Sequence, residues 1–422
     1  MYVADSRGTP AAPAARLTPG RRSAVAPTVL ALGAVSLVTD VSSEMVTAVL
    51  PLYLVTGLGL SPLGFGLLDG VYNGFSALVR LVGGHLADRG GRHKSVAVLG
   101  YGLSAVCKPL LLVAGSLPVI GAVLAADRTG KGLRTAPRDA MISLASAPEA
   151  RGRAFGVHRA MDTAGALLGP LAAFLILRQA VDGYDAVFTV SFCVAAAGVL
   201  VLVLFVPGRT AAERAPDAPR ASLKAALALL GEREVRRLAL CALLLGLATV
   251  SDSFVYLLLQ RRLDVPDRWF ALLPLGTAAA FLLLAVPLGR VADRVGRWQV
   301  FLGGHAALLC AYALLLPGRP GAALPYVVLA LHGLFYAATD GVLMAAAAGA
   351  VPAPLRSSGL ALIQTGQASA RFVCSIAFGA AWTAWGDRTA LGTAAVALAV
   401  CAAGAMLLGP AEPARTDGRT PA

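Results

Sequence analysis

The chain alternates long apolar runs with short segments that carry charges, glycine or proline. A helix needs about 20 mostly apolar residues to cross the hydrocarbon core of a bilayer, so each run is expected to form a membrane-spanning helix. The predicted spans are 28–54, 62–86, 95–114, 117–138, 154–177, 185–206, 238–259, 270–292, 299–316, 323–350, 358–383 and 389–409. The pattern therefore predicts an all-α membrane protein with twelve transmembrane helices.

A polar segment divides the twelve spans into two sets of six. We expect an N-terminal six-helix bundle over 25–206, a cytoplasmic linker over 207–237 and a C-terminal six-helix bundle over 238–410. Residues 1–24 are rich in Ala, Pro and Arg and lack periodicity, which predicts a disordered cytoplasmic tail, and 411–422 form the second tail.

The two sets of spans also resemble each other in sequence. "GHLADRGGR" (84–92) follows the second span, and "GRVADRVGR" (289–297) follows the eighth, 205 positions later. "LVTD", which ends at Asp40, has a counterpart in "ATVSD", which ends at Asp252. These echoes predict a duplicated unit of six helices. Parallel six-helix repeats related by an axis along the membrane normal are a transporter architecture.

The net charge of +13 lies mostly between the apolar runs, and the basic residues are not interleaved with aromatic ones. Nucleic-acid binding is therefore not expected. Most positive charges fall in the tails, the linker and the loops on the same side as both termini. The opposite loops hold fewer arginines: Arg178, Arg261, Arg262, Arg268, Arg319 and Arg388. The positive-inside rule then places both termini in the cytoplasm and the protein in the cytoplasmic (inner) cell membrane.

Several kinds of chemistry have no support in the sequence. The six cysteines occur singly, without a CxxC pair or metal-ligand spacing, so we expect neither a metal nor a cofactor. There is no GxxxxGK[ST] phosphate loop, which argues against an ATP-driven pump. Because no catalytic arrangement lies in a soluble segment, we do not expect an enzyme.

Charges are concentrated in the fourth span, within "AADRTGKGLRTAPRDA" (125–140). Asp127, Lys131, Arg134 and Arg138 recur at i, i+4, i+7 and i+11, which places them in a stripe about 60° wide on one helix face. A charge at mid-membrane costs roughly 2.5 to 3.5 kcal/mol on insertion scales, so this face is expected to meet water, protein or substrate rather than lipid.

The repeated G-x-L-A-D-R-x-G-R segment resembles the cytoplasmic signature of the major facilitator superfamily, and the likeness runs from the first span to the twelfth. "DRTGKGLRTAPRDA", "RGRAFGVHRAMDTAGALLGP" and "TDG" (339–341) are similar to a poorly characterised prokaryotic branch of that family. The resemblance implies two six-helix bundles that rock around a central cavity lined by the first, fourth, seventh and tenth helices.

The polar side chains of those four helices are the candidate site. We expect a substrate to bind among the following residues: Lys131, Arg134, Asp252, Tyr256, His332, Tyr336 and Asp340. Low dielectric favours a neutral carboxyl group and nearby cations favour its charged form, so alternate opening can make such a group take up and release a proton. Asp40 and Glu44 are the expected proton acceptors. Arg128 matches the family's fourth-helix arginine, which the resemblance ties to proton transfer.

The resemblance also implies a gate at the cytoplasmic ends of the even-numbered helices, where the acid and the arginine latch the two halves together. Its residues are Gly84, Asp88, Arg89, Arg92, Gly289, Asp293, Arg294 and Arg297. The glycines are expected to allow a tight turn and close approach.

Some intramembrane charges have a purely structural interpretation, in which they pair and hold helices together. We favour that interpretation for Arg138 with Asp139, and we expect His158 and Asp162, one turn apart, to form a local pair. Lys108 and Arg371 are isolated cations whose partners the sequence does not indicate.

The predicted function is proton-coupled secondary transport of a small anionic or zwitterionic organic solute by a monomer, with export preferred. The preference for export comes from "GALLGP" (165–170), which partly resembles a fifth-helix motif of antiporters. A symporter that imports a nutrient or organic anion is the alternative. From another class, a transport-fold protein could serve as a membrane sensor or assembly partner without moving solute.

Overall fold

The computed structural model describes residues 25–88, 93–147, 150–180, 183–208, 228–263, 266–317, 323–351 and 356–408. Within these ranges every regular element is a helix. The helices are α1 (Pro27–Leu52), η1 (Tyr53–Gly57), α2 (Pro62–Asp88), α3 (His93–Val113), α4 (Leu117–Leu144), α5 (Arg151–Gln179), α6 (Gly183–Phe205), η3 (Leu229–Gly231), α8 (Arg233–Leu247), α9 (Asp252–Leu263), α10 (Asp267–Phe270), α11 (Leu273–Val295), α12 (Arg297–Leu315), α13 (Leu324–Ala350) and α14 (Arg356–Leu408).

The helices account for the predicted membrane crossings. Nine helical segments among the described residues are long and apolar enough to span a bilayer. One of them, α14, contains two crossings, because Gly386 (φ 82°) interrupts it between the predicted eleventh and twelfth spans. The charged helices α2 and α4 are 27 and 28 residues long, which at 1.5 Å per residue is also enough to cross. The prediction of an all-α protein with twelve transmembrane helices is confirmed.

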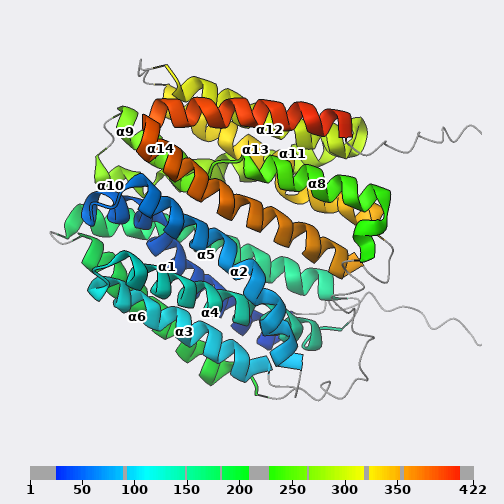
Figure 1. Cartoon of the computed structure of the whole chain (residues 1–422). Coiled ribbons are helices and arrows are strands. Elements are labelled where there is room, and N and C mark those ends of the chain that lie inside the picture. Colours follow the sequence, from blue (N-terminus) through cyan, green and yellow to red (C-terminus); the bar gives the residue numbers. More distant parts are fainter. Residues whose placement is uncertain are drawn as a thin grey trace, which may run out of the picture.

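The helices form two bundles that repeat the same packing (Figure 1). In the first bundle, α1 packs on α5, α2 on α4 and α3 on α4. In the second, the corresponding neighbours are α8 with α14, α11 with α13 and α12 with α13. The predicted duplication is therefore visible in the arrangement of the helices as well as in the sequence echoes.

The seventh span is broken, although the sequence predicts one continuous helix over 238–259. Residues 248–251 leave the helical path between α8 and α9. The freed Val250 amide donates to the Tyr312 hydroxyl of α12 at 2.8 Å, and the Ser251 carbonyl accepts from the amides of Phe254 and Val255 as α9 begins. Non-helical backbone at membrane depth occurs where it is buried in protein or lines a polar cavity.

At one end of the molecule, which we call the closed end, α2 and α14 are in backbone contact. A Cβ atom on Gly66 would lie 2.4 Å from the Ser375 carbonyl oxygen, and one on Gly379 would lie 2.5 Å from the Pro62 carbonyl oxygen. The Leu63 amide donates to the Thr383 hydroxyl at 3.0 Å. The contact continues along α2 to Gly74, where a Cβ atom would lie 3.0 Å from the Cβ atom of Phe372 in α14.

A second contact between the bundles lies on the other side of the closed end. The rings of Phe174 in α5 and Trp269 in α10 are 5.0 Å apart. Toward the opposite end of α5 and α11, Phe155 and Val295 are exposed, at 37% and 60%. The two bundles thus meet through α2 with α14 and through α5 with α10 and α11.

Candidate functional site

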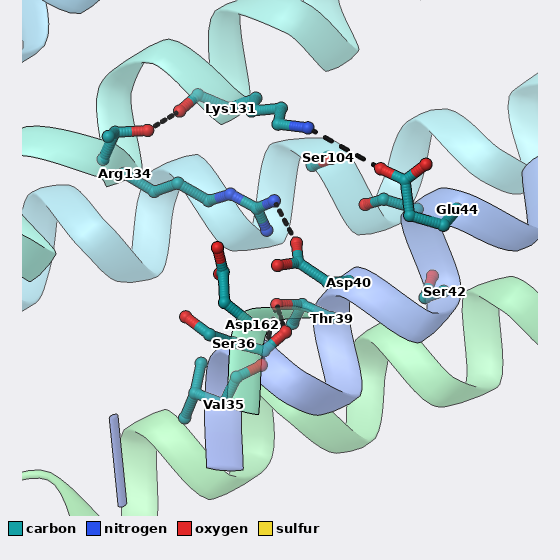
Figure 2. Close-up of polar contacts among 12 residues, drawn as sticks. Val35, Ser36, Thr39, Asp40, Ser42, Glu44, Ser104, Lys131, Arg134 and Asp162 are labelled. Carbon is teal, nitrogen blue, oxygen red and sulfur yellow. Dashed lines mark hydrogen bonds and ion pairs between the residues drawn. The ribbon is translucent and has the colours of Figure 1, made fainter. Parts of the chain in front are cut away.

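Two acidic residues of α1 face two basic residues of α4 (Figure 2). Arg134 Nη2 lies 3.4 Å from a carboxylate oxygen of Asp40, and Lys131 Nζ lies 4.0 Å from one of Glu44. The first pair is the more buried: the side chain of Arg134 is 4% exposed, against 37% for Lys131. A long, partly exposed ion pair is weaker than a buried one, so Glu44 and Lys131 are the easier partners to separate.

Asp127 forms the most enclosed charge cluster of the first bundle. It is ion-paired with its neighbour Arg128 and lies 3.7 Å from Lys108 of α3. The Ser104 hydroxyl donates to it at 2.5 Å. The three charged side chains are 4% to 11% exposed. The isolated cation Lys108 therefore has a partner, and this partner comes from the charged stripe of α4.

Arg128 also reaches the second helix. Its guanidinium lies 3.8 Å from the centre of the Tyr72 ring in α2, a cation–π arrangement. The Tyr72 hydroxyl is hydrogen-bonded to Thr47, three residues beyond Glu44 on α1. Arg128 is thus connected to the wall of the central cavity through Tyr72 and does not touch Asp40 or Glu44 within the described contacts.

The Arg138 end of the α4 stripe lies where α1, α4 and α5 meet. Arg138 is 3.0 Å from Asp139, as expected, and it also lies 3.7 Å from Asp162 of α5. The expected local pair of His158 with Asp162 is wrong: His158 Nε2 is instead hydrogen-bonded to Ser36 of α1 at 2.9 Å. The close packing of α5 on α1 brings the Ser36 hydroxyl within hydrogen-bond distance of this imidazole.

The second bundle carries its own polar cluster at the break in the seventh span. The Tyr336 hydroxyl donates to Asp252 at 2.5 Å, and His332 Nε2 lies 3.4 Å from the same carboxylate oxygen. His332 Nδ1 is 3.4 Å from the Thr277 hydroxyl, which accepts a hydrogen bond from Tyr256 at 3.0 Å. The cluster joins α9, α11 and α13.

A cavity of about 330 Å³ lies between the two bundles. α1 and α2 supply one wall, and the break at 248–251 supplies the other together with α9, α10, α11, α13 and α14. Its charged lining residues are Glu44, Asp252, Asp340 and Arg371. Pockets that bind small organic ligands usually begin near 300 Å³ and place a few polar groups in an apolar wall. The cavity therefore has the size and the chemistry of a site for a small polar solute.

The structure separates the sequence-predicted residues into two groups. Those that line the cavity are Glu44, Asp252, Tyr256, Tyr336 and Asp340. Asp40, Arg128, Lys131, Arg134 and His332 are not part of its lining. Lys131 and Arg134 were expected to bind substrate, but their described ion pairs are with acidic residues of α1.

The predicted gate is described only in part. Arg89 and Arg92 lie outside the described residues, and Gly84 and Asp88 lie in the last turns of α2, where side chains are not described. In the second copy Asp293 and Arg297 are 3.6 Å apart. The tight turn falls at Gly296 (φ 125°) between α11 and α12, and Arg294 lies in the last turn of α11, which ends at Val295. Gly289 lies inside α11 with nothing within 4 Å of a Cβ placed on it, so its expected turn and close contact are absent from this conformation.

Sequence reasoning missed two functional candidates. Asp69 of α2 is 5% exposed and accepts a hydrogen bond from the Ser375 hydroxyl of α14 at 2.7 Å. Arg371 of α14 lines the cavity, although the sequence indicates no partner for it. Asp69 lies between glycines at positions 66, 70 and 74, and this small-residue spacing could have marked a close helix contact.

Two bundles of six membrane helices around a polar cavity define the class of secondary transporters. The chain belongs to the Major Facilitator Superfamily, whose family model matches residues 32–375. In sequence it is 30% identical over 282 residues to an uncharacterized MFS-type transporter of Methanocaldococcus jannaschii, which covers 65% of this chain and 68% of that one. It is 37% identical over 156 residues to an uncharacterized protein of Mycobacterium tuberculosis, covering 37% of this chain and 38% of that protein.

Solved structures of transporters share the fold. The nucleoside transporter NupG superposes with a TM-score of 0.78 at 15% identity, covering 90% of this chain and 98% of that one. A bacterial homolog of the human lysosomal transporter Spinster, in an inward-facing and unoccupied conformation, superposes with a TM-score of 0.74 at 15% identity, covering 92% and 98%. At 15% identity this likeness establishes the fold and does not identify the substrate, which must be inferred from the residues of the cavity.

Proposed function

We propose that this protein is a proton-coupled secondary transporter that exports a small anionic or zwitterionic organic solute across the cytoplasmic membrane, in exchange for protons and as a monomer. The observation that carries the proposal is the polar cavity between the two bundles, in whose wall a carboxylate, Glu44, is held by a cation that does not line the cavity, Lys131. A scaffold without transport would gain no stability from leaving such charges in the membrane.

The conformation fits one state of an alternating-access cycle. With both termini in the cytoplasm, the closed end faces the outside, because α2 begins there and α14 turns there at Gly386. The contacts of Gly66 and Gly379 then block the outer path, and the exposed ends of α5 and α11 lie toward the cytoplasm. In the opposite state the α2–α14 contact opens and the Asp88 and Asp293 segments close the inner side.

Protons couple to this cycle through α1. A proton on Glu44 removes the charge that holds Lys131, and a proton on Asp40 does the same for Arg134. Each protonation releases a cation of α4, and Arg128 adds a fixed positive charge next to Tyr72 in the cavity wall. Because α1 and α4 belong to the same bundle, the pairs bias the shape of one cavity wall.

Export is favoured by the contact of "GALLGP" with α1. A Cβ on Gly165 would lie 2.4 Å from the Leu37 carbonyl oxygen, and one on Gly169 would lie 2.6 Å from the Glu44 Cβ. The segment that resembles an antiporter motif therefore seats α5 directly against the proposed proton acceptor.

The test is solute flux in proteoliposomes under an imposed pH gradient, with candidate solutes chosen by a thermal-shift screen. Ligand at 100 times its Kd stabilises a protein by about 2.7 kcal/mol, which such a screen detects. Export coupled to protons predicts that solute and protons move in opposite directions. Movement in the same direction would identify the importing symporter, and stabilising ligands that are never transported would identify the sensor.

A further inference from the structure

Among the described residues, the cavity is lined by one basic side chain, Arg371, which the proposed coupling does not use. Its Nε–H is buried and has no hydrogen-bond partner among the described residues. Its guanidinium lies 5.9 Å from the centre of the Tyr336 ring. A guanidinium presents five donors in a planar fork that matches a carboxylate or a phosphate, so an unengaged one in a cavity wall is a ready anion site.

The acidic residues of the cavity are not equally available. Glu44 is paired with Lys131, and Asp252 is engaged by Tyr336 and His332. Asp340 lines the same cavity, is exposed, and forms no hydrogen bond or ion pair within the described part of the chain. Arg371 and Asp340 therefore present opposite charges to one small space, and neither is held by a hydrogen bond or an ion pair among the described residues.

We infer that the cavity binds a zwitterionic solute, with its anionic group on the Arg371 guanidinium and its cationic group on the Asp340 carboxylate. The inference rests on the proposed transport function and narrows its substrate class. A purely anionic solute would leave Asp340 facing the ligand without a cation, and a purely cationic one would leave Arg371 without an anion. The volume of about 330 Å³ restricts the solute to small molecules.

The assignment also moves the anion site away from α4. Lys131 and Arg134 are occupied by Glu44 and Asp40 and do not line the cavity, so the solute's anion meets the second bundle. The solute's cation then approaches the carboxylates of the cavity, where it competes with a proton. Such competition is what an exchange of solute for protons requires.

The test is a thermal-shift panel on the purified full-length protein. It contains α-amino acids, ω-amino acids and dipeptides, each with its N-acetyl derivative and its C-terminal amide. We expect at least one zwitterion to stabilise the wild type more than either of its derivatives, and Arg371→Gln to weaken that zwitterion about ten- to 150-fold. Arg388→Gln, in the same helix and bonded to the Leu316 carbonyl, is the matched control and should bind normally.

Arg371→Gln alone leaves nearby acids without a cation and could unfold. The double variant Arg371→Gln, Asp340→Asn keeps the formal charge of the cavity, so it should melt near the wild type without ligand and should lose the zwitterion preference. If the wild type prefers the N-acetyl compound or the amide, or binds nothing in the panel, the inference is wrong. Failure of the transport proposal looks different, because zwitterions would then bind as expected and show no pH-driven flux in proteoliposomes.

Discussion

Asp69 of α2 accepts a hydrogen bond from the Ser375 hydroxyl of α14 at 2.7 Å, and this bond joins the two bundles in the middle of their backbone contact. Both side chains are buried, at 5% and 1% exposure. A buried carboxylate is costly unless it is hydrogen-bonded, so separating α2 from α14 exposes Asp69 to water and changes its surroundings completely. The closed end is a specific interface that opens as a unit.

Substitution of a glycine in this interface is predicted to separate α2 from α14. In Gly66→Ala the new methyl group would lie 2.4 Å from the Ser375 carbonyl oxygen, so α2 and α14 must separate. Overpacking of this kind costs about 1 to 3 kcal/mol, enough to shift a two-state equilibrium roughly five- to 150-fold. Pulsed EPR between labels at Val113 and Tyr326, both exposed at the closed end, should show a longer distance. Gly102→Ala is the control, because nothing lies within 4 Å of a Cβ atom at this position, and it should leave the distance distribution unchanged. If Gly66→Ala gives the same distribution as Gly102→Ala, the predicted separation of α2 from α14 is wrong.

The Asp127 cluster predicts a loss of stability. Asp127→Asn removes the charge that compensates Lys108 and Arg128, and breaking a buried ion pair from one side costs about 3 to 5 kcal/mol. The melting temperature in detergent should fall markedly, and adding Lys108→Met should recover part of the loss. Asp139→Asn is the control, because that side chain is 44% exposed. Equal melting temperatures for Asp127→Asn and the control would show that the cluster is not structural.

The second copy of the repeated signature predicts an effect on the cycle with little effect on stability. Asp293 and Arg297 are 69% and 46% exposed, and exposed ion pairs contribute about 0 to 1 kcal/mol. Asp293→Asn should therefore melt near the wild type. It should slow transport because the proposed inner latch cannot form, and Asp88→Asn should do the same. Wild-type flux in both variants would remove the gate from the mechanism.

Neutralising Asp40 and neutralising Glu44 are predicted to cause different transport defects. Asp40→Asn should abolish pH-driven accumulation and leave exchange of solute at equal pH largely intact, because Arg134 loses its titratable partner while the cavity wall is unchanged. Glu44→Gln should change both solute affinity and coupling, since Glu44 lines the cavity. If Asp40→Asn keeps its pH dependence, Asp40 holds helices together and Glu44 is the coupling residue.

The sequence predicts the membrane spans and the turn at Gly386, because these depend on the local pattern of apolar and polar residues. Apolar runs of about twenty residues locate the spans, and the turn at Gly386 falls where the pattern breaks. The break at 248–251 could not be predicted from the sequence pattern, because the segment contains neither glycine nor proline. The backbone amide of Val250, inside this break, donates instead to the hydroxyl of Tyr312, which lies 62 residues further along the chain.

Charge pairing was predictable only in part. The spacing on α4 shows that Lys131 and Arg134 avoid lipid, whereas their partners depend on which helix packs against that face. Lys108 and Arg371 are single charges in apolar runs, so no helical spacing links them to another group. Their surroundings follow from the packing of α3 on α4 and from the position of α14 at the cavity.

In the proposed mechanism, solute and proton movements are coupled through the carboxylates of α1, Asp40 and Glu44. The most direct measurement is the internal pH of proteoliposomes, reported by a trapped dye, when a solute identified by the binding panel is added outside without an imposed pH gradient. Coupling through α1 predicts that the wild type moves protons out as the solute enters, and that Asp40→Asn exchanges the solute without a change in pH. Normal exchange by the wild type with a constant internal pH would contradict it.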